Sequence, residues 1–256
     1  MNKWLEKSLD LAQNEDYLDR LLEVYPIRTH PQRQVDPQVW KGFKHLYEKG
    51  DANRLLFEKM LEFKKFPIKN SYVSFLRRDR NAIFDNPKVV EKICNMVLAM
   101  DLDDIYFYVS EPMENNRTMG SHFRNYVEKL LLDFSPTGTG YILLDSDAVL
   151  KKHAEEQISY ERNKGLDFFA KLNETYIIGE AKFLTEMGGH QNNQLLDALT
   201  TLETPVATDQ MVEKVLFLDG VIYQNAMFKK LENYQDYNIM SALFLEEFLN
   251  EFVWYR

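Results

Sequence analysis

The 256-residue sequence is poor in the residues that several common site types require. Its one cysteine, Cys94, excludes an intramolecular disulfide and a zinc site built from several thiolates. The five histidines show no paired metal-ligand spacing, which argues against zinc hydrolysis. No Gly-x-Ser-x-Gly motif occurs, and Gly138-Thr139-Gly140 lacks the length and the lysine of a phosphate loop. Serine hydrolases, zinc hydrolases and P-loop nucleotide binders are therefore not indicated.

The sequence also lacks long apolar runs. No run is long enough to span a bilayer, and the first seven residues lack the hydrophobic core of a signal peptide. We therefore expect a cytoplasmic protein without a membrane partner.

Basic residues are fewer than acidic ones, with 31 lysines and arginines against 40 aspartates and glutamates, so the formal net charge is −9. This balance argues against a DNA-binding protein, since lysine and arginine contacts to phosphate dominate nonspecific affinity. Net charge does not fix the local field, however, and a basic cleft can coexist with acidic outer faces. A solvated basic face explains basic segments about as well as DNA contact does. The arginines that we consider as DNA contacts are Arg77, Arg78, Arg80, Arg117 and Arg124, and Tyr72 and Phe75 lie near the first three.

Two neighbouring segments, residues 166–172 and 176–182, predict the strands of a β-hairpin. A short turn between them, of either two or four residues, pairs Asp167 with Glu180. Because side chains alternate along a strand, Glu180 and Lys182 project from one face, and Asp167 joins them there. The hairpin therefore gathers two carboxylates and an ammonium group.

Two carboxylates that face each other across paired strands repel unless a cation lies between them. Mg²⁺ fits this position, because it binds few protein oxygens and takes the rest of its shell from water and substrate phosphate. It would polarise a scissile phosphate and activate water, while Lys182 neutralises developing charge or holds the water. An ordinary solvated strand face is the alternative. Residues 176–179 are apolar on both faces, which is typical of a strand covered on two sides, so charges at its end need partners.

The order of Asp167, twelve intervening residues and Glu180-Ala181-Lys182 resembles the active-site signature of the PD-(D/E)xK nucleases. This superfamily contains most type II restriction endonucleases. Leu166 stands where the signature has a proline. Residues 116–123, residues 179–183 followed by 188–194, and residues 217–223 also resemble blocks of one group of small restriction enzymes.

The resemblance implies a type II restriction endonuclease that hydrolyses double-stranded DNA at a short palindromic site. It implies Asp167 and Glu180 as ligands of Mg²⁺, for which Mn²⁺ substitutes, and Lys182 as a further catalytic residue. It also implies a homodimer, because two-fold protein symmetry matches a two-fold symmetric site.

Three further polar residues are weaker candidates for the site. Glu128 corresponds by position to an acidic residue that many members of the superfamily use as an additional metal or water contact, and a helix-surface carboxylate is the alternative. Gln191 and Gln194 lie three residues apart at the start of a predicted helix, where the helix dipole favours phosphate. Both glutamines are candidates for DNA contact near the scissile bond, with ordinary helix-surface positions as the alternative.

The pattern of elements predicts an α/β protein with a restriction-endonuclease-like core, in which helices flank a mixed central sheet. We place the catalytic core in residues 119–256, with C-terminal helices, and a mainly helical region for DNA recognition or dimerisation in residues 1–118. The predicted core has a helix at 119–133, a strand at 141–144, a helical stretch at 147–163, the hairpin, a helix at 191–202, a strand at 215–218 and outer helices at 225–233 and 239–252. In the first region we expect helices at 3–24, 37–47, 51–65 and from 87 to 98, and a strand at 105–109.

Two other functions are compatible with such a core. One is a repair or structure-specific nuclease without sequence preference. The other is a non-catalytic DNA-binding protein that keeps the fold, and the intact set of Asp167, Glu180 and Lys182 argues against it.

Overall fold

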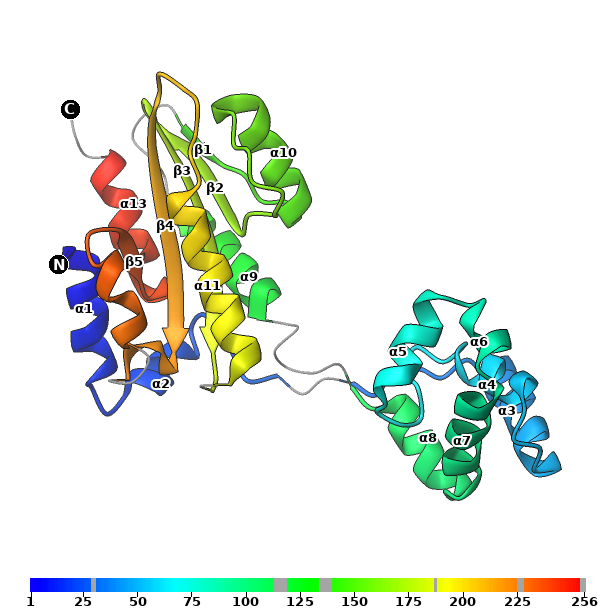
Figure 1. Ribbon diagram of the computed structural model, residues 1–256. Helices are drawn as coiled ribbons and strands as arrows, with labels where there is room; N and C mark the ends of the chain where they lie inside the picture. Colours follow the sequence, from blue (N-terminus) through cyan, green and yellow to red (C-terminus); the bar gives the residue numbers. More distant parts are fainter. Residues whose placement is uncertain (29–30, 113–118, 134–139, 187, 225–227, 254–256) are drawn as a thin grey trace. The chain divides into compact units, whose positions relative to one another are not determined.

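A computed structural model describes residues 1–28, 31–112, 119–133, 140–186, 188–224 and 228–253 (Figure 1). The chain forms two compact units. One combines Met1–Ile27 with Asn115–Arg256 and is called the sheet unit here, and the other, Arg28–Glu114, is the helical unit. The expected boundary at residue 118 therefore needs a correction at the amino terminus. The first 27 residues belong with the sheet, because Trp4, Leu5 and Leu21 are buried in its core.

A five-stranded mixed sheet organises the sheet unit, and its strands follow one another in chain order. The first three strands are antiparallel, and the last three are parallel. The β2–β3 hairpin pairs Phe168 with Gly179 and Leu172 with Thr175, which is the predicted register. The strands are β1 (Gly140–Ile142), β2 (Phe168–Leu172), β3 (Thr175–Leu184), β4 (Met211–Gly220) and β5 (Asn238–Met240).

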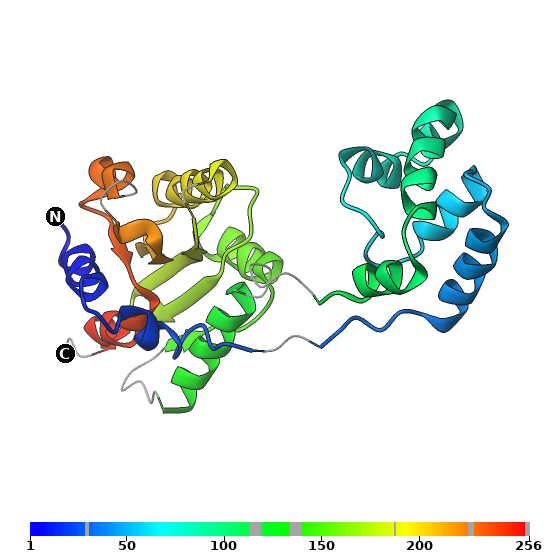
Figure 2. The same cartoon turned by 90° about the horizontal axis from the view of Figure 1, so that it is seen from below.

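Helices cover both faces of this sheet. On one face, Phe123 of α9 (Met119–Asp133) packs against Phe217 of β4. On the other face lie α10 (Asp147–Ile158), whose apolar residues join Ile178 in one cluster, and α11 (Gly189–Glu203), which contacts β3 and β4. Figure 2 shows α9 and α11 on opposite sides of the sheet. The helices α1 (Lys3–Ala12), α2 (Tyr17–Leu21) and α13 (Leu245–Val253) complete the unit.

Several predicted helices of the sheet unit have different bounds. The helix expected at 239–252 is wrong at its start, because Ile239 and Met240 are buried in β5 and pair with β4. A 3₁₀ helix, η3 (Lys229–Tyr234), lies in the region of the helix expected at 225–233, of which residues 225–227 are outside the described residues. The helix expected at 3–24 is two helices, since the polar residues 13–16 separate α1 from α2.

The helical unit packs its helices around a core of its own, which includes Phe43, Phe57 and Ile93. The side chain of Asp36 caps the first helix by accepting a hydrogen bond from the Gln38 backbone nitrogen at 2.7 Å. The helices are α3 (Pro37–Lys49), α4 (Arg54–Met60), α5 (Ser71–Arg78), α6 (Ala82–Asp85), α7 (Pro87–Leu98) and α8 (Leu102–Ser110).

The strand expected at 105–109 is wrong, because these residues lie within α8. Ile105 and Val109, four residues apart, are buried on one side of the helix, and the residues between them are exposed. Asp103 and Asp104 lie in the first turn of α8, where their negative charges interact favourably with the positive end of the helix dipole. Helical burial therefore overrides the strand preference of the aromatic and β-branched residues. None of the helices in the described ranges is both long and apolar enough to cross a membrane.

Candidate active site

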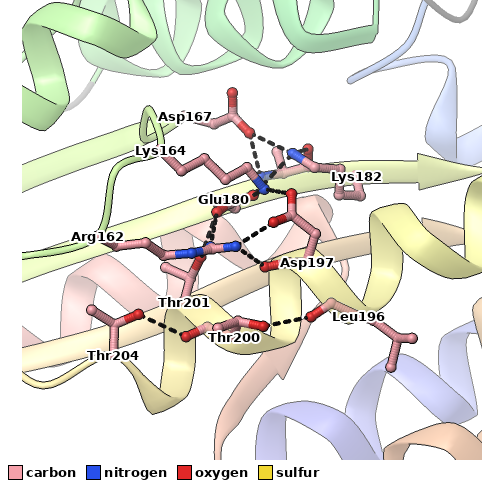
Figure 3. A network of polar contacts seen from close by, with 11 residues as sticks. Arg162, Lys164, Asp167, Glu180, Lys182, Leu196, Asp197, Thr200, Thr201 and Thr204 are labelled. Atoms are coloured by element: carbon pink, nitrogen blue, oxygen red, sulfur yellow. Dashed lines mark hydrogen bonds and ion pairs between the residues drawn. The ribbon is translucent and has the colours of Figure 1, made fainter.

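Asp167, Glu180 and Lys182 converge at one end of the β2–β3 hairpin (Figure 3). Asp167 directly precedes β2, and its backbone nitrogen donates to the Gly179 carbonyl at 3.0 Å, which extends the strand pairing. Its Oδ2 accepts hydrogen bonds from the Ala181 backbone nitrogen and from Lys182 Nζ, each at 3.0 Å. The structure therefore brings the three predicted side chains together.

The ammonium of Lys182 is surrounded by three oxygen atoms. It lies 2.9 Å from the Ala181 carbonyl oxygen, 3.0 Å from Asp167 Oδ2 and 3.2 Å from Glu180 Oε2. Burial alone lowers the pKa of Lys182, but the two carboxylates outweigh burial and raise this pKa above its ordinary value. Lys182 is therefore positively charged at neutral pH.

Glu180 is fully buried, at 0 % exposure, and both of its carboxylate oxygens have partners. Oε1 accepts a hydrogen bond from Arg162 Nη1 at 3.0 Å and another from the Thr201 hydroxyl. Oε2 accepts from Lys164 Nζ at 2.6 Å and lies near Lys182. A buried carboxylate needs such partners, because an unpaired charge in the interior is strongly unfavourable.

A further acidic residue, Asp197 of α11, closes this network on its outer side. Its carboxylate forms ion pairs with Arg162 and with Lys164, and its carbonyl oxygen accepts from Arg162 Nη2 at 2.6 Å. Burial acts to raise the pKa of Asp197, but the nearby Lys164 and Arg162 lower it overall. Three cationic and three anionic side chains therefore form one charge-balanced cluster (Figure 3).

The residues that sequence reasoning missed are Arg162, Lys164, Asp197 and Thr201. Arg162 and Lys164 precede Asp167 by five and three residues, and this closeness in sequence is a signal that they lie near the site. No comparable signal exists for the residues of α11, because the packing of that helix on the sheet decides where they point.

The oxygen atoms around Lys182 fit a divalent cation. Two carboxylates and a carbonyl are the donors that Mg²⁺ takes from proteins, and a cationic group already occupies their common centre. In the part of the chain that the structure describes, no cluster of three or more histidine, cysteine, aspartate or glutamate residues is suited to a metal. A metal at this position would therefore rely on Asp167, Glu180 and the Ala181 carbonyl, with further ligands from water or substrate.

The other site candidates on the helices of the sheet unit, apart from its arginines, are Glu128, Gln191 and Gln194, and they differ in exposure and in hydrogen-bond partners. Glu128 is exposed on α9, and no described hydrogen bond or ion pair joins it to the cluster. Gln191 is buried, accepts from the Thr185 backbone nitrogen at 2.7 Å and donates to the Thr185 hydroxyl at 2.6 Å, so it stabilises the connection from β3 to α11. Gln194 is half-buried on α11. The catalytic and DNA-contacting roles of these three residues stay predictions.

The predicted arginines lie in both units. Arg77 and Arg78 are exposed at the end of α5, Arg80 follows them, and Arg124 is exposed on α9. Arg117 lies outside the described residues. Burial, and to a smaller extent the neighbouring Arg80, lowers the pKa of Arg77.

The two units differ in charge. Residues 28–114 contain 15 lysines and arginines against 13 aspartates and glutamates, whereas the rest of the chain contains 16 against 27. Six of the positive residues of the helical unit fall between positions 64 and 80, where Asp79 is the only acidic residue. Tyr72 and Phe75 of α5, in the same segment, are 62 % and 60 % exposed. The negative net charge therefore belongs to the sheet unit.

Comparison with known proteins gives one match over most of the chain. The model of the Tsp45I type II restriction enzyme family matches residues 2–252. No curated protein and no solved structure matches the sequence. The matched range includes the hairpin and residues of both units.

Proposed function

This chain belongs to the Tsp45I type II restriction enzyme family, and on that basis we propose that Asp167, Glu180 and Lys182 form its phosphodiesterase centre. Family membership makes the chain a site-specific endonuclease that acts on DNA, and it favours neither the repair nuclease nor the non-catalytic protein. The observation that carries the assignment is the convergence of two carboxylates and a carbonyl on one cationic position.

Type II restriction enzymes generally need a divalent metal, and we propose Mg²⁺, with Mn²⁺ as a substitute. Asp167 and Glu180 would hold it together with the Ala181 carbonyl. When bound, the metal supplies Lewis acidity toward the oxygens of the scissile phosphate. The Lys182 ammonium would then donate to a phosphate oxygen or to the attacking water instead of the carboxylates.

The residues of the hairpin support hydrolysis by in-line displacement. Water attacks phosphorus and gives up one proton to solvent, the new bond between oxygen and phosphorus forms as the bond to the leaving sugar oxygen breaks, and that sugar oxygen takes up one proton from solvent. Lys182, kept protonated by its neighbours, stabilises the negative charge that grows on the phosphate oxygens. Before metal and substrate bind, Asp167 holds this ammonium in place and is itself oriented by the Ala181 backbone nitrogen. The products are a phosphate monoester and a sugar hydroxyl.

The helical unit is the proposed DNA-recognition module. Its positive balance and the exposed Tyr72 and Phe75 beside Arg78 suit a surface that binds phosphate and stacks on bases or sugars. The proposed phosphate contacts are Arg77, Arg78, Arg80, Arg117 and Arg124, with Gln191 and Gln194 as candidates near the scissile bond and Glu128 as an additional catalytic candidate. A homodimer on a palindromic site and a cytoplasmic location complete the proposed function.

Plasmid digestion tests the active-site assignment. With Mg²⁺, the wild-type protein is expected to produce discrete fragments, whereas Asp167→Asn and Glu180→Gln each abolish cutting. Asp209→Asn, which changes an exposed aspartate of the same unit, is the matched control and should cut normally. Near-normal cutting by either active-site variant would defeat the assignment.

A further inference from the structure

Arg162 joins Glu180 of β3 to Thr201 and Asp197 of α11, although it is not one of the proposed metal ligands. Its side chain is only 14 % exposed, and each of its terminal nitrogens has two partners. Nη1 donates to Glu180 Oε1 and to the Thr201 hydroxyl, while Nη2 donates to the carboxylate and the carbonyl of Asp197. A planar guanidinium suits this double contact, and an ammonium cannot reproduce it.

The two oxygens of Glu180 have different kinds of partners. Oε1 is bound by Arg162 and Thr201, whereas the described polar partners of the Asp167 carboxylate are Ala181 and Lys182. Oε2 is shared by two flexible ammonium groups, those of Lys164 and Lys182. One oxygen is therefore fixed by the fold, while the other is turned toward the position that a metal and substrate would share.

We propose that Arg162 is a positioning residue that, with Thr201, pins Oε1 of Glu180 so that Oε2 faces the metal position, and that Lys164 competes with the metal for Oε2. This inference rests on the proposed function of Glu180. Asp197 in turn fixes Arg162 and offsets the charge of the two basic residues.

The two roles predict opposite effects on metal binding. Loss of Arg162 or of the Thr201 hydroxyl releases Oε1, so that the carboxylate must be ordered when the metal binds. Loss of Lys164 removes a cation from Oε2, so that the metal meets less competition. Removal of a group that orients a metal ligand typically costs about 10- to 100-fold in metal affinity.

The test measures Mn²⁺ binding to the DNA-free protein, with free Mn²⁺ quantified by electron paramagnetic resonance. Arg162→Ala and Thr201→Val should raise the dissociation constant about 10- to 100-fold. Thr201→Ser, which keeps the hydroxyl, should bind like the wild type, and Lys164→Met should bind more tightly than the wild type. Arg20→Ala, which changes an exposed arginine of the same unit, serves as the control.

The expected pattern is confirmed only if the variants move in these opposite directions while melting temperatures stay near that of the wild type. If Arg162→Ala does not fold, the Thr201→Val and Thr201→Ser pair decides. Unchanged Mn²⁺ affinity in both Arg162→Ala and Thr201→Val, or weaker binding by Lys164→Met, would overturn the inference.

Asp167→Asn separates this inference from the proposed function. Wild-type affinity for Mn²⁺ in Asp167→Asn means that the proposed metal site itself is wrong. Weakened binding in Asp167→Asn together with unchanged binding in Arg162→Ala and Thr201→Val leaves the site in place and removes only the positioning role.

Discussion

The replacement Asp219→Asn should change how the stability of the sheet unit depends on pH. Asp219 lies near the end of β4, beside Phe183 in the register with β3, and is fully buried. Its carboxylate accepts hydrogen bonds from Tyr25 Oη at 3.1 Å, Ser241 Oγ at 2.6 Å and the Ala242 backbone nitrogen at 3.1 Å. Burial nevertheless raises the pKa of Asp219 to about 6, because desolvation outweighs these hydrogen bonds.

The sign and size of the effect follow from this pKa. The ordinary value is 3.8, so folding raises the pKa of Asp219 by about two units, which corresponds to about 3 kcal/mol. Because the folded state binds the proton more tightly than the unfolded state, the stabilisation is complete well below pH 4. It is lost as the pH rises through about 6. Asparagine carries no charge at any pH and shows no such loss.

The assay is urea denaturation between pH 4 and pH 8 in a Trp40→Phe background. That background removes the tryptophan of the helical unit, so that fluorescence follows the sheet unit. The free energy of unfolding of the parent minus that of Asp219→Asn should fall by about 2 kcal/mol between pH 4 and pH 7, because part of the full effect is already lost at pH 4. A constant difference over this range, or a difference that grows with pH, would refute the reasoning. Asp209→Asn, an exposed aspartate, should show no such change.

Two further predictions concern the helical unit. Arg78→Ala should weaken DNA binding and reduce the magnitude of the slope of log K against log salt concentration by about 0.9, as expected for one lost phosphate contact. Fluorescence anisotropy at several salt concentrations measures this slope. An unchanged slope would show that Arg78 does not contact DNA phosphate. Ile105→Ala should lower the free energy of unfolding of this unit by about 2–5 kcal/mol, because Ile105 is fully buried on α8. The exposed Phe107 of the same helix provides the control, and an equal loss in Phe107→Ala would contradict the helical assignment.

The hairpin register could be predicted because it depends on local features. A short turn and alternation with a period of two are enough to pair residues 168–172 with 175–179 and to bring Asp167 close to Glu180. The mixed sheet with flanking helices could be predicted for a similar reason, since helical and strand-like segments follow one another in a recognisable order.

The contacts of Arg162, Thr201 and Asp197 could not be predicted, because they depend on how α11 packs against β3. The position of residues 1–27 against the sheet is likewise a contact between distant parts of the chain. The error at α8 has a local cause. Three consecutive exposed aromatic residues, 106–108, resemble a strand, and only the burial of Ile105 and Val109 four residues apart reveals the helix.

The separation of charge between the units explains how an acidic chain is compatible with DNA binding. The helical unit has a formal charge of +2 within a chain of −9, because its 15 basic residues exceed its 13 acidic ones. The net charge of the whole sequence does not reveal this difference between the two units, because most of the acidic residues lie in the sheet unit.

We propose that one ammonium and two carboxylates of the β2–β3 hairpin form the hydrolytic centre. The most direct test is the single-turnover rate of plasmid cleavage by Lys182→Met with saturating Mg²⁺, compared with the wild type and with Lys152→Met, a change of an exposed lysine on α10. Lys182→Met should cut at least about 100-fold more slowly, as expected when a group that stabilises transition-state charge is lost, while Lys152→Met should cut at the wild-type rate. A rate for Lys182→Met within a few-fold of the wild type would contradict this proposal.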